Sequence, residues 1–191
     1  MPDKDFLLEI GTEEIPARFL PPAVSQLTDG VRRFLTDKRI RSGDVRADAT
    51  PCRLVVHARD IAPSADTRVI ERTGPPWDAA HDAQGKPTPA LLGFLKSAGA
   101  TPKQVVRVEK KDRIFVGVRI EEKGRPTSEL LVEFLPGLIA GLHFPKNMRW
   151  LTGDASAFAR PVRRILCLLH GRPLRIRAFG LDSGAVTPGK L

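Results

Sequence analysis

Residues 105–124 (VVRVEKKDRIFVGVRIEEKG) constrain the fold more than any other stretch of the chain. Apolar and polar residues alternate in two runs, and the charged segment Lys110–Arg113 separates them. Alternation with a period of two is typical of half-buried strands, and a short polar segment between two such strands favours a hairpin. We therefore predict a β-hairpin near residues 105–121, which requires antiparallel pairing in this part of the fold.

The remaining pattern mixes strands and helices in irregular order. Apolar residues recur at helical spacing between Pro21 and Ile40, which predicts an amphipathic helix with a basic outer face. The other predicted elements are strands over 6–10, 53–61, 163–171 and 174–179, and helices over 89–97 and 127–143. Because the sequence has no regular βαβ period and no internal repeat, the predicted fold class is α+β.

Cap and turn residues predict where the two shorter helices begin and end. Thr88 is expected to cap the first of them, and Gly99 to end it. Thr127 or Ser128 should cap the second, in which Pro136 should cause a kink or lie near a break.

Residues 62–90 are rich in proline, glycine, aspartate and alanine, and they contain the stretches GPPW and DAQGKPTP. This composition predicts a long loop or an internal boundary. The chain has 191 residues, enough for one domain with a core or for two small domains.

Positive charge is concentrated in the C-terminal half. Residues 1–100 hold 14 Lys/Arg and 14 Asp/Glu, so residues 101–191 carry the whole net charge of +9. Within residues 143–180, eight basic residues accompany a single acid, Asp154. Such a concentration favours a polyanionic partner such as a nucleic acid. The alternatives are a basic surface that maintains solubility, or one that contacts an acidic protein.

Two basic stretches are the strongest candidates for binding, KNMRW (146–150) and FARPVRR (158–164). Lysine and arginine contact phosphates, arginine in a bidentate manner, while an amide and one indole ring add hydrogen bonding and stacking. The candidate nucleic-acid-binding residues are Lys146, Asn147, Arg149, Trp150, Arg160, Arg163 and Arg164. The alternative is a solvated basic loop with Trp150 in the core.

No stretch of the sequence predicts catalysis or metal binding. Glu13 and Glu14 are adjacent, so their carboxylates point apart and cannot face one substrate together; a structural role before a helix is expected. Phosphate-loop, dinucleotide, zinc-protease and nucleophile-elbow motifs are missing, and the four histidines are isolated in sequence. We expect no catalytic residue, no metal ligand and no cofactor bound by this chain.

The sequence also predicts a cytoplasmic protein. The first residues lack the basic and long apolar regions of a secretory signal, and no stretch reaches the roughly 18 apolar residues of a membrane span. Cys52 and Cys167 lie far apart and are expected to be free thiols in a reducing compartment.

Several stretches together resemble one known family. LLEIGTEEIPARFLPPA near the N-terminus, TPCRLVVHA (50–58), the block from GPP to GF (74–94), HFPKNMRW (143–150) and FARPVRRILCLL (158–169) occur in this order. The pattern is similar to the N-terminal part of the β-subunit of bacterial heterotetrameric glycyl-tRNA synthetase, over roughly residues 5–185. Two departures are Arg164, where the family commonly has tryptophan, and the final VTPGKL.

The resemblance implies a non-catalytic region of a longer β-subunit, residues 1–191, that binds tRNA and supports assembly. It implies that the partner α-subunit uses ATP and Mg²⁺ to attach glycine to tRNA, within a cytoplasmic α2β2 heterotetramer. Because the family subunit is several times longer, the chain is expected to be a fragment, a truncated product or a short relative. The alternative function is a stand-alone basic module that binds RNA or protein without a role in ligation.

Overall fold

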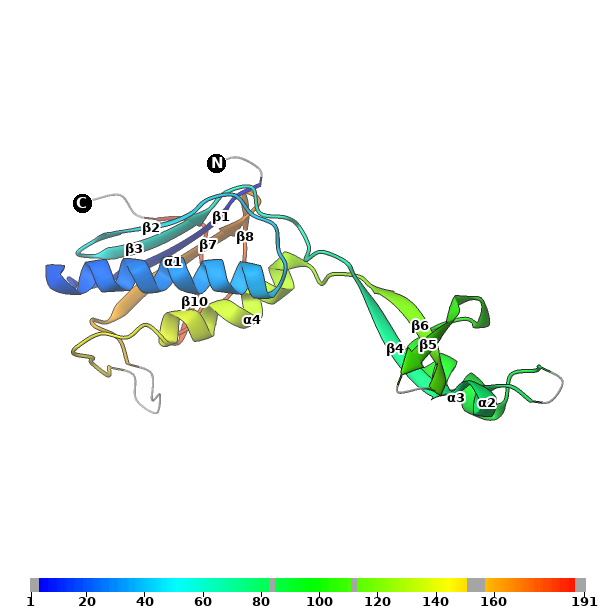
Figure 1. Cartoon of the computed structure of the whole chain (residues 1–191). Helices are drawn as coiled ribbons and strands as arrows, with labels where there is room; N and C mark the ends of the chain where they lie inside the picture. The colour runs from blue at the N-terminus through cyan, green and yellow to red at the C-terminus, as the bar shows by residue number, and fades with distance from the viewer. Residues whose placement is uncertain (1–3, 83–84, 111–112, 151–156, 188–191) are drawn as a thin grey trace. The chain divides into compact units, whose positions relative to one another are not determined.

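The computed structural model describes residues 4–82, 85–110, 113–150 and 157–187, and the chain forms two compact units (Figure 1). Unit 1 comprises Met1–Asp66 together with Arg125–Leu191, and unit 2 comprises Thr67–Gly124. Helices and antiparallel sheets occur in the chain together, which confirms the predicted α+β class.

Unit 1 is built on a five-stranded antiparallel sheet in the order β2-β3-β1-β7-β8. Its strands are β1 (Phe6–Thr12), β2 (Val45–Thr50), β3 (Arg53–Ala58), β7 (Val162–Leu169) and β8 (Arg172–Pro173). Successive side chains of a strand point to opposite faces. On the central strand β1, Phe6, Leu8 and Ile10 are therefore buried in the main core, whereas Glu9 and Gly11 face the other side of the sheet.

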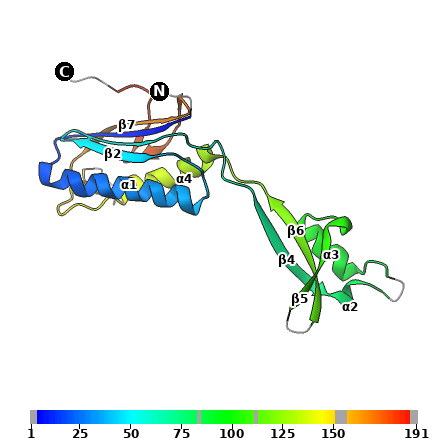
Figure 2. The ribbon, with the colours of Figure 1, turned by 45° about the horizontal axis from the view of Figure 1, so that its top comes forward.

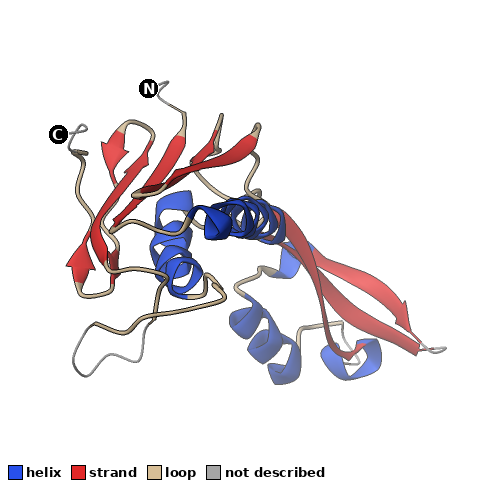
Figure 3. Ribbon diagram, turned by 90° about the vertical axis from the view of Figure 1, so that its left-hand side faces the viewer, coloured by secondary structure: helices blue, strands red, loops and turns tan. Residues whose placement is uncertain are grey.

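Helices α1 (Leu20–Asp37) and α4 (Thr127–Ala140) cover the core face of this sheet, as Figures 2 and 3 show. A short 3-10 turn, η1 (Ala17–Phe19), leads into α1. The buried residues of α1 recur every three or four positions and pack in one core with those of α4, which confirms the predicted amphipathic helix. The rings of Phe34 and Phe134 stack between the two helices, with their centroids 4.0 Å apart.

The start of α4 differs from the prediction. The helix begins after Pro126 without a side-chain cap, because the Thr127 hydroxyl donates instead to the carbonyl oxygen of Ala62 (2.6 Å). The predicted capping by Thr127 or Ser128 is therefore wrong. Pro136 lies inside the last turns of α4.

The predicted strand over 174–179 is also largely wrong. β7 turns back through His170 and Gly171 into β8, whose two residues pair with it, and the Leu174 N–H donates to the Cys167 carbonyl oxygen (2.9 Å) before the pairing ends. The next strands, β9 (Arg177–Ala178) and β10 (Leu181–Asp182), pair with each other in a separate ribbon. Gly184 occupies the edge of β7 instead, since its N–H donates to the Ile165 carbonyl oxygen at 2.8 Å.

Unit 2 contains a three-stranded antiparallel sheet in the order β4-β6-β5. Its elements are β4 (Arg68–Pro76), α2 (Trp77–Ala80), α3 (Pro89–Ala98), the 3-10 turn η2 (Pro102–Gln104), β5 (Val105–Lys110) and β6 (Arg113–Glu122). The β5–β6 pair confirms the predicted hairpin. Leu91 and Leu95 of α3 pack with Val116 and Val118 of β6 in a small core separate from that of unit 1.

The ends of α3 agree with the sequence, whereas the predicted long loop before it does not. Thr88 accepts a hydrogen bond from the Leu91 N–H (3.5 Å), and Gly99 ends the helix with a φ of 64°. Residues 62–90 hold β4 and α2 rather than one long loop. The change from unit 1 to unit 2 falls between Asp66 and Thr67.

The chain leaves and re-enters unit 1 at neighbouring points. The Ala65 N–H donates to the Arg125 carbonyl oxygen (3.0 Å), and the Thr127 N–H donates to that of Pro63 (2.9 Å). Unit 2 is therefore an insertion whose two ends are held together by unit 1 itself. Within the described ranges, no helix is long and apolar enough to cross a membrane.

Candidate nucleic-acid interface

The basic loop (residues 143–150), which contains the predicted stretch KNMRW, is anchored at both ends by aromatic side chains. Phe144 is buried and packs edge-on against Phe158, with centroids 4.8 Å apart. Trp150 packs against the main core and stacks on Phe179 at 5.3 Å. The indole ring is therefore held by the protein, as in the alternative that placed Trp150 in the core. Phe144 and Trp150, the two aromatic residues of HFPKNMRW, thus both support the loop.

Between these anchors, the polar side chains of the loop face solvent. Lys146, Asn147 and Arg149 are all exposed, and among the described residues neither of the two cations forms an ion pair. The Met148 N–H donates to the Phe158 carbonyl oxygen (2.7 Å), and the Phe158 N–H donates back to Met148 (3.1 Å). This bridge brings together the two basic stretches that the sequence had singled out.

Arg160 lies beside the loop. Its Nη1 donates to the carbonyl oxygen of Ala159 (2.9 Å) and lies 3.6 Å from the sulfur of Met148. The structure therefore groups Lys146, Asn147, Arg149 and Arg160 as neighbours on two bridged segments. A cation cluster of this kind suits phosphate groups, which accept charge-assisted hydrogen bonds.

Arg163 is paired with an acid from the other end of the chain. Its guanidinium forms an ion pair with Glu13, and the Glu13 N–H donates to the carbonyl oxygen of Pro161 (3.0 Å). Both side chains of the ion pair are exposed, so its contribution to stability is small. Glu13 therefore contacts the segment 158–164 through both its side chain and its backbone N–H.

Arg164 lies over Gly11, on the face of the sheet opposite the main core. Its Nε is 3.5 Å from the carboxylate of Glu9, which is only 5% exposed. Arg53 of β3 approaches the same carboxylate at 3.2 Å, and the Thr187 hydroxyl donates to it at 2.6 Å. A buried carboxylate needs such partners. The members of this cluster are up to 178 positions apart, so local sequence patterns do not reveal it.

The space occupied by Arg164 depends on the glycine beneath it. A Cβ atom at position 11 would lie 2.5 Å from Cγ of Arg164. Gly11 therefore leaves room for the arginine to lie over β1 and approach Glu9. Of the seven candidates, Trp150 packs on the core, Arg164 lies beside the buried carboxylate of Glu9, Arg163 is paired with Glu13, and Arg160 bonds a backbone carbonyl oxygen. Lys146, Asn147 and Arg149 are exposed.

Asp5, His57 and His170, elsewhere in unit 1, have structural partners. Nε2 of His57 donates to the buried carboxylate of Asp5 (2.8 Å), and Nε2 of His170 donates to the Ile61 carbonyl oxygen (2.9 Å). Burial alone raises the pKa of Asp5. The hydrogen bonds from the Asp60 N–H and from His57 outweigh that effect and hold the pKa below its ordinary value of 3.8.

The two thiols differ in environment, and neither forms a disulfide. Cys52 is exposed, whereas burial raises the pKa of the Cys167 thiol to about 12. A thiol that stays protonated at neutral pH is a poor nucleophile. Across the described part of the chain, no three His, Cys, Asp or Glu side chains lie close enough to hold a metal ion.

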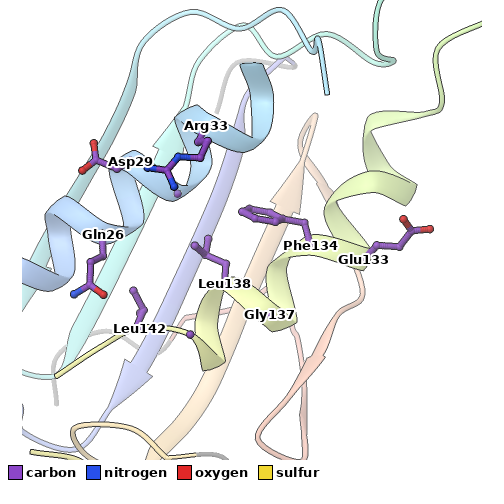
Figure 4. A pocket seen from close by; sticks show the side chains of 10 residues that line it. Gln26, Asp29, Arg33, Glu133, Phe134, Gly137, Leu138 and Leu142 are labelled. Carbon is purple, nitrogen blue, oxygen red and sulfur yellow. The ribbon is translucent and has the colours of Figure 1, made fainter. Parts of the chain in front are cut away.

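A groove of about 610 Å³ runs between α1 and α4 (Figure 4). Phe134, Leu138 and Leu142 supply its apolar lining, and Gln26 and Arg33 are among its polar residues. A Cβ atom at Gly30 would lie 2.5 Å from Cδ1 of Leu138, so the glycine lets the two helices pack closely. Leu142 directly precedes the basic loop, which places one end of the groove beside that loop.

Comparison with known proteins gives consistent matches. Residues 6–191 match the family model described as glycyl-tRNA synthetase beta subunit. The chain is 47% identical over 185 residues to the glycine–tRNA ligase beta subunit of Anaeromyxobacter dehalogenans strain 2CP-C, covering 97% of this chain and 26% of that protein. It is 42% identical over 187 residues to the corresponding subunit of Desulforamulus reducens, covering 97% and 27%. The chain thus spans about a quarter of the length of these curated relatives.

Proposed function

Because the chain belongs to the family of glycyl-tRNA synthetase beta subunits, we propose that it is a non-catalytic tRNA-binding and assembly region of such a subunit. In this proposal it supports the ATP- and Mg²⁺-dependent attachment of glycine to tRNA by a partner α-subunit. The full-length assembly would be an α2β2 heterotetramer in the cytoplasm. The residues of this chain bind and orient the tRNA, and the partner supplies the chemistry.

One observation carries this proposal: exposed cations project from a loop whose ends are fixed. Lys146 and Arg149 lie between the anchored rings of Phe144 and Trp150, with Arg160 beside them. A loop with fixed ends loses less conformational entropy on binding, because its side chains are held near their binding positions before the ligand arrives. Phosphate groups of the tRNA backbone are the ligand that this spacing of positive charge suits best.

The seven candidate residues then take two roles. Lys146, Arg149, Arg160 and Arg163 contact phosphates, and Asn147 adds a hydrogen bond from its side-chain amide. Trp150 and Arg164 hold the two basic stretches in place rather than touch the tRNA. Arg163 must share its charge with Glu13, so we expect its contribution to be the smallest of the four cations.

The first experiment measures the binding of a glycine-accepting tRNA transcript to the 191-residue chain between about 50 and 200 mM salt. The log–log plot of affinity against salt should have a slope of about −3 to −4, since each neutralised phosphate adds about −0.9. The double variant Lys146→Glu/Arg149→Glu should weaken binding by about 10- to 100-fold at 100 mM salt and make the slope shallower by about 2.

A matched control separates placement from total charge. Lys96→Glu/Lys123→Glu changes the net charge by the same amount in unit 2, where both side chains are exposed, and it should alter affinity by less than about threefold. Equal losses in the two double variants would contradict the assignment to the basic loop. Weak binding of the unaltered chain with little response to salt would contradict tRNA binding itself and favour a role in contact between proteins.

A further inference from the structure

Gln26 of α1 makes a two-point hydrogen bond with the first residue of the basic loop. Its Nε2 donates to the carbonyl oxygen of His143 (2.9 Å), and its Oε1 accepts from the His143 N–H (2.8 Å). The two residues are 117 positions apart in sequence. This pair of hydrogen bonds forms a clamp that joins the start of the basic loop to a helix distant along the chain.

The chemistry of the partners fixes the orientation of the amide. A backbone carbonyl only accepts and a backbone N–H only donates, so Nε2 must face the His143 oxygen and Oε1 must face its nitrogen. The same Nε2 lies 3.2 Å from the carbonyl oxygen of Pro22, which occupies its second hydrogen. The amide nitrogen therefore has no hydrogen left for an external ligand, and its role is to hold the backbone of the protein.

The clamp acts at the start of the loop, ahead of its exposed cations. In Figure 4, Gln26 lies on α1 and Leu142 lies where the chain leaves α4, at the same end of the groove. Phe144, the residue after His143, enters the aromatic cluster, and Lys146 follows two residues later. Two successive residues are thus fixed, one through its backbone and one through its ring, and only Pro145 separates them from the first exposed cation.

We propose that Gln26 is a positioning residue for tRNA binding: it sets the direction in which the basic loop leaves α4 and so aligns Lys146 and Arg149 with successive phosphates. The inference rests on the proposed function. Without the clamp, the start of the loop samples more conformations, and the free protein must order it at the moment of binding. Affinity should fall, and so should the number of phosphates neutralised at once.

The test compares Gln26→Ala and Gln26→Glu with Ser25→Ala in the 191-residue chain. Glutamate keeps an acceptor for the His143 N–H but loses the donor to its carbonyl. Ser25 is the matched control, because it is an exposed neighbour on α1 whose hydroxyl donates to Asp29 within the helix. Hydrogen exchange of the His143 amide reports the clamp directly. Binding of the glycine-accepting tRNA transcript over the salt series reports its consequence.

We expect Gln26→Ala to lose protection of the His143 amide, to raise the Kd by about three- to tenfold at 100 mM salt, and to make the salt slope shallower by about 1. Gln26→Glu should fall between this variant and the unaltered chain, and Ser25→Ala should match the unaltered chain. A merely structural role would lower the melting temperature and leave the salt slope of the folded protein unchanged.

Two outcomes would overturn the inference, and they are distinguishable from failure of the proposed function. Loss of His143 protection with unchanged Kd and slope would show that the clamp does not serve binding, while the tRNA site stands. Unchanged protection in Gln26→Ala would show that the clamp does not hold the loop. If the unaltered chain has no salt-dependent affinity for tRNA, the proposed function fails first and this inference fails with it.

Discussion

At the scale of single residues, Asp5 links three segments of unit 1. Its carboxylate accepts from the Asp60 N–H at 3.1 Å and from His57 at 2.8 Å, while its own carbonyl accepts from the His170 N–H. These bonds favour the ionised form, which is why the pKa of Asp5 is lowered despite its burial. The folded protein therefore binds this proton less readily than the unfolded chain does.

The pH dependence of stability follows from this lowered pKa of Asp5. The stabilisation is complete at pH values well above 3.8, the ordinary pKa of the group, and it is lost as the pH falls through the lower pKa of the folded state. Asp5→Asn should lower the free energy of unfolding at pH 7 by about 1–3 kcal/mol. It should also flatten the decline between about pH 5 and pH 2. Urea unfolding at a series of pH values measures both effects.

An exposed aspartate provides the comparison. Asp48→Asn, on the open face of β2, should change neither the stability at pH 7 nor its acid dependence by more than about 0.5 kcal/mol. If Asp5→Asn declined as steeply with acid as the unaltered chain, the ionised state of Asp5 would not be the source of the effect.

The sequence is least informative about the candidate site at the level of single residues. The local sequence was enough to identify KNMRW as basic and to offer the core as an alternative place for Trp150. It could not indicate that Arg163 meets Glu13, 150 positions away, or that Arg164 meets Glu9. Charge counts treat every arginine alike, whereas the pairing of β1 with β7 sets Arg164 opposite Gly11 and so near Glu9.

At the scale of elements, two glycines lining the same groove have opposite surroundings. A Cβ atom on Gly137 of α4 would meet nothing within 4 Å, whereas one on Gly30 of α1 would meet Leu138 at 2.5 Å. Gly137→Ala should therefore stabilise unit 1 by about 0.5–1 kcal/mol through helix propensity alone. Gly30→Ala should stabilise it less, or not at all, because Leu138 must move.

A double-mutant cycle in urea tests the explanation. In the background of Leu138→Ala, Gly30→Ala should regain the full benefit of about 0.5–1 kcal/mol. Equal effects of Gly30→Ala in both backgrounds would mean that contact with Leu138 does not determine the outcome.

Elements with a strong local pattern could be predicted, and elements defined by distant partners could not. The alternation of β5 and β6, the 3.6-residue period of α1, and the Thr88 and Gly99 ends of α3 are all local signals. β4 carries Gly74 and two prolines and is largely exposed, so only its pairing with β6 makes it a strand. The failed cap at Thr127 has a similar cause, because its hydroxyl partner, Ala62, is 65 positions away.

At the scale of the whole molecule, the hydrogen bond between Ala65 and Arg125 means that unit 1 can fold without unit 2. Replacing Thr67–Gly124 by a short Gly/Ser linker should leave unit 1 folded, because both ends of the insertion are already neighbours within it. The linker between Asp66 and Arg125 is then shorter than the insertion that it replaces, so closing it costs no more entropy than before. The shortened chain should still unfold cooperatively, as followed by circular dichroism, and should keep the basic loop's affinity for tRNA within about threefold. Loss of cooperative unfolding would contradict the independence of unit 1.

The close approach of Arg164 to Gly11 has a consequence for how such chains diverge. Any side chain at position 11 would occupy the volume that the arginine fills, and a shorter residue at position 164 would leave Glu9 with one cation fewer. Position 11 can then gain a side chain only in a lineage that has already lost the arginine, whereas position 164 can change while position 11 stays glycine. Related sequences that carry another side chain at position 11 should therefore also lack the arginine at position 164.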